Sequence, residues 1–171
     1  MGCKFYYAGN CSSVSSAKHK APDLPFCSEY SIIIKEFYFG VMILEKLSLT
    51  KKLRVEEENL ACAMGSGSLM VLATPAVVAL MENAAAELAQ NILGSDELTT
   101  VGTMISIEHI SPTPIGAEIS ATAVLTENNG RSFCFDVSAS DPCGEIAHGT
   151  HTRVSVNAEK FQAKADGKLD G

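Results

Sequence analysis

The chain has 171 residues, of which 46% are hydrophobic and 19% charged, a composition typical of one folded domain and not of a disordered chain. Its formal net charge is -7, and the only basic cluster is Lys51, Lys52 and Arg54, which argues against nucleic-acid binding. The apolar run over residues 32–44 is interrupted by charged residues and is too short to cross a bilayer, so no membrane anchor is expected.

The cysteines show neither a C-x-x-C pair nor a Cys/His cluster with zinc spacing, so no metal site is expected. We interpret them as reduced thiols in a cytoplasmic protein. The N-terminus also lacks the order of charged, apolar and small residues that is typical of a signal peptide. The six cysteines are Cys3, Cys11, Cys27, Cys62, Cys134 and Cys143.

Residues 1–41 contain cysteine, serine, lysine and aromatic residues with no steady period. We interpret them as an N-terminal extension outside the fold. Our hypothesis is that the extension is non-native and that Met42 is the natural start. The folded domain is then expected over residues 42–171.

The first elements that the sequence pattern predicts are a strand over residues 47–57 and a flexible loop at residues 65–68. Thr74 and Pro75 then predict the start of a long helix, with Thr74 as N-cap and Pro75 as the first helical residue. The helix is expected to reach Leu93 because Gly94 is a typical stop signal. It is apolar nearly all round, which predicts a buried helix.

Four strands are expected after the helix, over residues 98–110, 117–126, 132–139 and 145–156. Asn129-Gly130 predicts a tight hairpin, and residues 141–144 predict another turn. One strand, one buried helix and four antiparallel strands favour an α+β hotdog fold, in which a curved antiparallel sheet wraps around a long central helix. Wrapping leaves an edge strand exposed, which favours a homodimer.

Two titratable residues stand out in apolar surroundings. Glu82 lies in a helical segment that is otherwise almost wholly apolar, and a buried carboxylate needs a partner. It is either part of a site or directed toward a gap in the packing. His109 shares a strand face with Ile105 and Ile107 by the period-two rule, so it should face the helix, as a catalyst or as a satisfied core histidine.

Three further residues have both a structural and a functional interpretation. Thr74 is explained by helix capping, although a helix N-terminus also suits a developing oxyanion. Gly102, inside a strand, is typical of a bulge or of close backbone approach to a ligand. His151 and Arg153 alternate in the last strand with residues of the other face, and we expect them to face solvent. The alternative for Arg153 is a contact with a substrate carbonyl or phosphate.

From about Leu47 to Lys164 the chain resembles the fluoroacetyl-CoA thioesterase-like family of hotdog proteins. The spacings from Thr74 to Glu82 and from Gly102 to His109 are those of the family. The matching sequence segments are Ala73-Thr74, Ala79-Leu80-Met81-Glu82, Gly102-Thr103 running to His109, Ser111-Pro112-Thr113-Pro114, Gly149-Thr150-His151 with Arg153, and Glu159-Lys160-Phe161.

The resemblance implies an acyl-CoA thioesterase with a Thr-Glu-His constellation at a dimer interface. Glu82 would activate water as a base or attack the thioester as a nucleophile, and His109 would stabilise or protonate the leaving thiolate. Thr74 would orient the carboxylate or the thioester, while the Gly102 backbone and Arg153 would line the pocket and contact the substrate. No metal or separate cofactor is implied, since coenzyme A enters as part of the substrate.

The segment before Thr74 departs from the fluoroacetyl-specific pattern because residues 65–70 contain no aromatic side chain. We therefore expect a more open pocket for a short or medium acyl group. Two alternatives remain open, namely a non-catalytic acyl-CoA or small-ligand binding protein and a hotdog hydratase or dehydratase. The second of these resembles a pattern that is not found in this chain.

Overall fold

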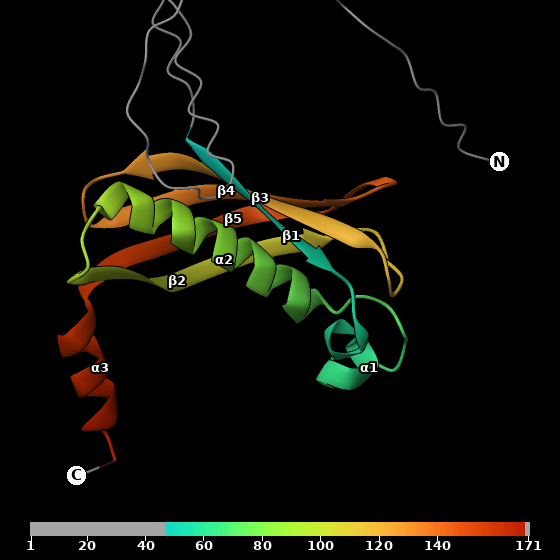
Figure 1. Cartoon of the computed structure of the whole chain (residues 1–171), viewed down its shortest axis with the longest axis horizontal. Coiled ribbons are helices and arrows are strands. Elements are labelled where there is room, and N and C mark those ends of the chain that lie inside the picture. Colours follow the sequence, from blue (N-terminus) through green and yellow to red (C-terminus); the bar gives the residue numbers. More distant parts are fainter. Residues whose placement is uncertain (1–46, 170–171) are drawn as a thin grey trace, which may run out of the picture. The chain divides into compact units, whose positions relative to one another are not determined.

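The computed structural model describes residues 47–169, which form one antiparallel sheet with helices around it (Figure 1). The predicted extension over residues 1–41 and the proposed start at Met42 lie outside the described residues. The strands are β1 (Ser48–Arg54), β2 (Leu98–His109), β3 (Glu118–Asn128), β4 (Ser132–Asp141) and β5 (Gly144–Asn157). The helices are the 3₁₀ helix η1 (Glu57–Asn59), α1 (Ala61–Met64), α2 (Thr74–Leu93) and α3 (Ala158–Asp166).

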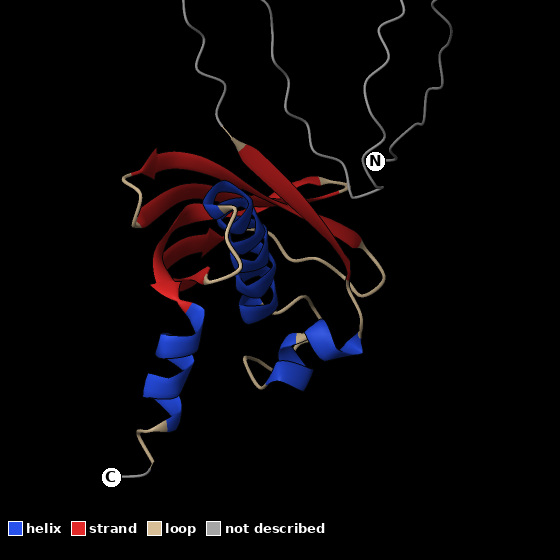
Figure 2. Ribbon diagram, turned by 60° about the vertical axis from the view of Figure 1, so that its left-hand side comes forward, coloured by secondary structure: helices blue, strands red, loops and turns tan. Residues whose placement is uncertain are grey.

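The sheet has the strand order β1-β3-β4-β5-β2, and every neighbouring pair is antiparallel. The long helix α2 lies across one face of this sheet, as Figure 2 shows. The predicted α+β arrangement, with one long helix against an antiparallel sheet, is confirmed. Because β2 follows α2 directly but lies beside the last strand, β2 and β5 place residues distant in the sequence next to one another.

The core lies between the sheet-facing side of α2 and the inner face of the strands. Val77, Met81 and Ala85 of the helix are completely buried, as is Ile119 of β3. Fully burying a side chain such as that of Met81 contributes about 1.5–3 kcal/mol. Small alanines fill much of the rest of this helix face, so the helix backbone can approach the sheet closely.

Some boundaries differ from the sequence-based expectation. The first strand ends at Arg54 because η1 follows it, with the Asn59 side chain accepting a hydrogen bond from the Glu56 N–H at 2.9 Å. In addition, α3 follows the last strand, where the sequence analysis predicted no helix. Its N-cap is Asn157, whose side chain accepts from the Lys160 N–H at 3.0 Å, a common helix-start signal.

The two edge strands differ in character. β1 carries Lys51 and Lys52, and charged residues of this kind discourage edge-to-edge pairing. β2 instead exposes Met104, and its ladder with β5 shifts register between Gly102 and Met104, which marks a β-bulge. No helix within residues 47–169 is long and apolar enough to span a membrane.

Candidate active site

The first polar cluster joins the start of α2 to the end of β2. The expectation that Thr74 is the N-cap is wrong, because Ala73 takes that position and Thr74 is the first helical residue. Its hydroxyl contacts the strand instead, since Thr74 Oγ1 lies 2.9 Å from His109 Nδ1. His109 faces the helix, as predicted, and its other ring nitrogen, Nε2, is buried without a partner among the described residues.

The second cluster surrounds Glu82. Its carboxylate oxygen Oε1 lies 3.7 Å from His151 Nε2, and a β-carbon at position 102 would lie only 2.7 Å from the same oxygen. Glycine at position 102 therefore lets the Glu82 carboxylate lie directly against the β2 backbone. The Glu82 side chain is 39% exposed, so the predicted burial of this carboxylate is only partial.

The expectation that His151 and Arg153 face solvent is wrong. His151 is 1% exposed and Arg153 8%, and both point to the face that α2 covers. The strand alternation was identified correctly, but polarity suggested the wrong face. Polar side chains can occupy an inner face when their hydrogen bonds are satisfied there, as they are here.

The buried pair is held by four hydrogen bonds. His151 Nδ1 donates to the Met104 carbonyl at 2.8 Å, next to the β2 bulge. Arg153 Nε donates to Thr100 Oγ1 at 2.9 Å, and Nη2 donates to the Thr100 carbonyl at 2.8 Å. Arg153 Nη1 lies 3.2 Å from His151 Nε2, which accepts because Nδ1 carries the ring proton.

Burial sets the charge state of His151. It lowers the pKa of the imidazole below 6.5, and the Arg153 charge lowers it further, although the bond to Met104 and the charge of Glu82 act in the opposite direction. His151 is therefore neutral at physiological pH. Burial also lowers the pKa of Arg153, while the charge of Glu82 opposes this shift.

This arrangement occurs within a sequence that matches a known protein family. The family model described as fluoroacetyl-CoA-specific thioesterase matches residues 55–159, which include every residue of both clusters. The chain belongs to this family.

Individual relatives agree with the family match. The chain is 39% identical over 94 residues to the fluoroacetyl-CoA thioesterase of Streptantibioticus cattleyicolor, covering 55% of this chain and 67% of the relative. A solved structure of a fluoroacetyl-CoA thioesterase superposes with a TM-score of 0.67 at 30% identity, covering 72% of this chain and 95% of that one. A hot-dog-like protein from Thermanaerovibrio acidaminovorans, at 18% identity, has a TM-score of 0.66 and covers 74% and 93% of the two chains.

These similarities confirm three sequence-based expectations. The resemblance to the fluoroacetyl-CoA thioesterase family is correct, the fold is the hotdog fold, and the protein is a thioester hydrolase.

Within one copy of this chain, the five predicted site residues lie in two groups. Thr74 meets His109, and Glu82 meets Gly102 and, through His151, Arg153. Thr74 and Glu82 are eight residues apart on α2, which corresponds to about 12 Å along the helix axis. No hydrogen bond or ion pair of the described residues joins Glu82 to His109.

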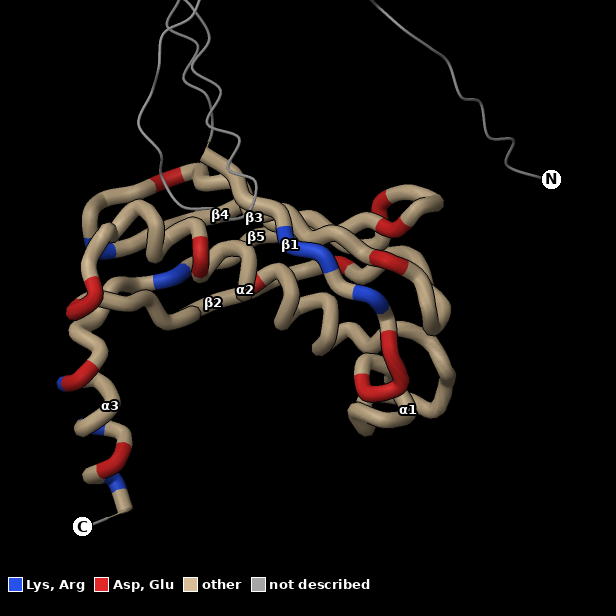
Figure 3. Tube along the Cα trace, viewed as in Figure 1, with Lys and Arg blue, Asp and Glu red and all other residues tan. Residues whose placement is uncertain are grey.

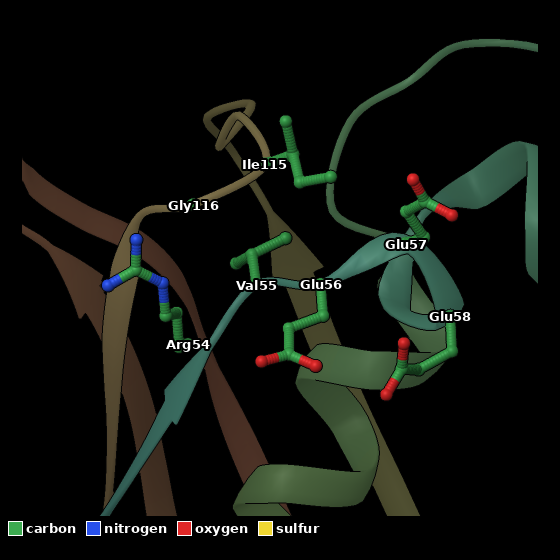
Figure 4. A pocket seen from close by; sticks show the side chains of 7 residues that line it. All are labelled: Arg54, Val55, Glu56, Glu57, Glu58, Ile115 and Gly116. Atoms are coloured by element: carbon green, nitrogen blue, oxygen red, sulfur yellow. The ribbon is translucent and has the colours of Figure 1, made fainter.

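Two surface cavities lie outside both clusters. One, of about 390 Å³, is shown in Figure 4 and is lined by Arg54, Val55, Glu56, Glu57, Glu58, Ile115 and Gly116. The other, of about 420 Å³, lies between β1 and α2 and is lined by Lys51, Lys52, Leu53, Asn59, Met64, Ala76, Ala79, Leu80 and Asn83. Neither is lined by a predicted site residue.

The two lysines that line the second cavity both have carboxylate partners. Figure 3 shows the basic stretch of β1 followed by the acidic residues of η1. Lys51 pairs with Glu87 and Lys52 with Glu118 at 3.1 Å, so these lysines do not offer an unpaired charge to a phosphate. Across residues 47–169 no group of three or more His, Cys, Asp or Glu side chains could hold a metal ion.

Proposed function

We propose that the protein hydrolyses a short or medium acyl-CoA to the free acid and CoA, as a homodimer that uses Thr74, Glu82 and His109. The main support is the Glu82 carboxylate, which is half-exposed, lies beside Gly102, and accepts no hydrogen bond from any described residue. A carboxylate with unoccupied lone pairs can accept a proton from water or attack a thioester carbonyl.

In the proposed reaction a water molecule, or first the carboxylate itself, attacks the thioester carbonyl carbon, and the carbon–sulfur bond then breaks. On the direct route Glu82 takes one proton of the water. On the covalent route an anhydride with Glu82 forms and water then hydrolyses it. His109, oriented by the Thr74 hydroxyl, stabilises or protonates the departing thiolate.

The supporting groups bind and orient the substrate. The Gly102 backbone lines the space next to Glu82, where the absence of a side chain permits close approach. Arg153 uses three of its five N–H groups on Thr100 and His151, which leaves two for a substrate oxygen. Within this proposal coenzyme A enters as part of the substrate, and the enzyme works in the cytoplasm without a cofactor.

The acyl preference follows from the loop before α2. Leu69 and Met70 are each 68% exposed, and residues 65–70 supply no aromatic ring to close over a small acyl group. An open apolar margin of this kind favours an ordinary short or medium acyl chain over fluoroacetyl selectivity.

The proposed homodimer forms through the exposed edge of β2. Met104 is 50% exposed on this edge strand, and Leu98 at its start is 37% exposed. An exposed edge with apolar side chains can pair with the same strand of a second copy, whereas β1 is protected by its lysines. A dimer of this kind would also bring a second copy of each cluster near the first.

The experiment is thiol release from a panel of acyl-CoAs of increasing chain length, followed with a colorimetric disulfide reagent after subtracting the signal of the protein's cysteines. Glu82→Gln and His109→Ala should each lower kcat by at least about a hundredfold. Glu87→Gln is the matched control, because it makes the same change on the same helix at a residue paired with Lys51.

Retained folding by circular dichroism is required of each variant. Acyl-CoA binding without thiol release from any substrate would contradict the proposal and favour a non-catalytic binding protein. A single-turnover reaction in oxygen-18 water separates the two routes, since label in the Glu82 carboxylate supports the anhydride.

A further inference from the structure

Within residues 47–169, the hydrogen-bond partners of the buried Arg153 guanidinium are all neutral. The acceptors around it are the Thr100 hydroxyl, the Thr100 carbonyl and the His151 ring. The ion pairs of residues 47–169 do not include Arg153, although it is 8% exposed. Buried cations are usually paired with a carboxylate, so this arrangement requires an explanation.

The nearest candidate for such a pair is Glu82, which acts electrostatically on both Arg153 and His151. Its Oε1 lies 3.7 Å from His151 Nε2, and the same ring nitrogen accepts from Arg153 Nη1 at 3.2 Å. Both groups therefore approach the imidazole at the same atom, Nε2. The side chains of Arg153 and Glu82 share one neutral neighbour without forming an ion pair.

The other groups that face Glu82 do not replace this contact. Gly102 of β2 presents only backbone, and His109 of the same strand is bonded to Thr74 at the far end of the helix. Lys51 of β1 is engaged by Glu87. The inward residues of β3 and β4 are apolar, namely Ile119, Ala121, Ala123, Phe133, Phe135, Val137 and Ala139.

We propose that His151 is a positioning residue that holds the Arg153 guanidinium away from the Glu82 carboxylate, and so keeps that carboxylate free of an ion pair. Its Nδ1–H is fixed by the Met104 carbonyl, which directs Nε2 toward Arg153 as an acceptor. A guanidinium that closed on Glu82 would occupy the lone pairs needed for attack or proton transfer. The inference rests on the proposed function only for the role of Glu82 in hydrolysis.

The test compares two substitutions of one side chain. His151→Gln retains a side-chain oxygen at the position of Nε2 and can still accept from Arg153. His151→Asn retains a group near Nδ1 that can bond to the Met104 carbonyl, but removes the acceptor for Arg153. Crystal structures of both variants are the first readout, because they do not depend on activity.

In the His151→Asn structure we expect a direct Arg153–Glu82 ion pair at about 2.7–2.9 Å. In His151→Gln the guanidinium should remain on Thr100 and the new side chain. An unmoved guanidinium in His151→Asn would overturn the inference, whatever the protein is found to hydrolyse.

Kinetics on the acyl-CoA that is hydrolysed best form the second readout. We expect kcat of His151→Asn to fall at least about tenfold with KM little changed, and the acid limb of its pH–rate profile to move to lower pH. His151→Gln should restore most of the rate. A rate loss without displacement of the acid limb, or displacement to higher pH, contradicts the inference.

Thr100→Val keeps the experiment decisive if His151→Asn does not fold. It removes the other side-chain acceptor of Arg153 with little change in volume, and leaves His151 in place. We expect the guanidinium to move toward Glu82 and the acid limb to shift in the same direction, by a smaller amount. If neither change occurs in a folded Thr100→Val protein, the inference is wrong.

Discussion

Gly102 has no side chain, and this absence leaves room for the Glu82 carboxylate beside β2. A β-carbon there would be 2.7 Å from Glu82 Oε1 and 3.1 Å from His151 Cε1. The carboxylate is the far end of a flexible side chain, so it can move aside at a small cost of about 0.5–1.5 kcal/mol. We expect Gly102→Ala to fold with a similar melting temperature while kcat/KM for thioester hydrolysis falls at least about tenfold.

The matched control for this substitution is Gly167→Ala, beyond the end of α3, whose new β-carbon would lie 3.4 Å from the Ala163 carbonyl oxygen. It should change neither stability nor rate. Equal rate losses in the two alanine variants would show that the loss at position 102 does not come from displacement of Glu82.

The sequence alone indicated which residues are candidates for the site, but not which contacts they make. Glu82 and His109 were found because a titratable group in an apolar pattern is unusual, and the structure places both against α2 or on it. Thr74 was assigned as a cap because cap statistics depend on residue type, whereas the structure shifts the helix start by one residue. His151 was wrongly expected to face solvent, because its buried hydrogen bonds to Met104 and Arg153 cannot be inferred from the sequence pattern.

At the element scale, the paired strands β2 and β5 contribute residues to the two clusters, and their pairing depends on Gly149. A β-carbon at this position would overlap the backbone carbonyl of Ser106 and lie 2.7 Å from Ile107 Cα. Backbone atoms cannot move aside like a flexible side chain, so the two strands would have to separate. We expect Gly149→Ala to lower the free energy of unfolding by about 2 kcal/mol or more, measured by urea denaturation.

A fall of less than about 0.5 kcal/mol, which is within the range of ordinary surface substitutions, would mean that β2 and β5 are less closely packed than the structure indicates. Gly167→Ala again provides the reference, since it lies outside the sheet.

Most elements were predictable because their signals are local. The hairpin at Asn129-Gly130, the helix end at Gly94 and the strand alternation depend on neighbouring residues, and all three are confirmed. The order of strands in the sheet is not local, since β2 joins β5 across a long stretch of chain. The sequence predicted one curved sheet against one buried helix but not this order, because strand order depends on contacts between distant segments.

At the scale of the whole molecule, the buried His151 links stability to pH. Its pKa in the folded protein is lowered by burial, while in the unfolded chain it returns to about 6.5. Below that pH the unfolded state binds a proton that the folded state resists, so this contribution is present above 6.5 and is lost as the pH falls toward the folded value. The slope is at most about 1.4 kcal/mol per pH unit for one proton.

Urea denaturation of the wild type and of His151→Gln between pH 7 and 5 measures this linkage. The wild type should lose stability more steeply than the variant, because only the wild type has the buried His151 imidazole, whose pKa burial lowers. Parallel curves would show that His151 does not resist protonation in the folded state.

In the proposed homodimer, the two clusters of one subunit can each act with residues of the other subunit. Thr74, which contacts His109, lies about 12 Å along the axis of α2 from Glu82, and no hydrogen bond or ion pair of the described residues joins Glu82 to His109. We expect Glu82 of one subunit to act with His109 of the partner subunit. The decisive sample is then a mixture of two inactive proteins, His109→Ala and Glu82→Gln, allowed to exchange subunits. Half of the dimers are mixed, and each mixed dimer has one site with both native residues, so about a quarter of wild-type kcat should return. Persistent inactivity, despite exchange confirmed by native mass spectrometry, would place Glu82 and His109 of one site in the same subunit.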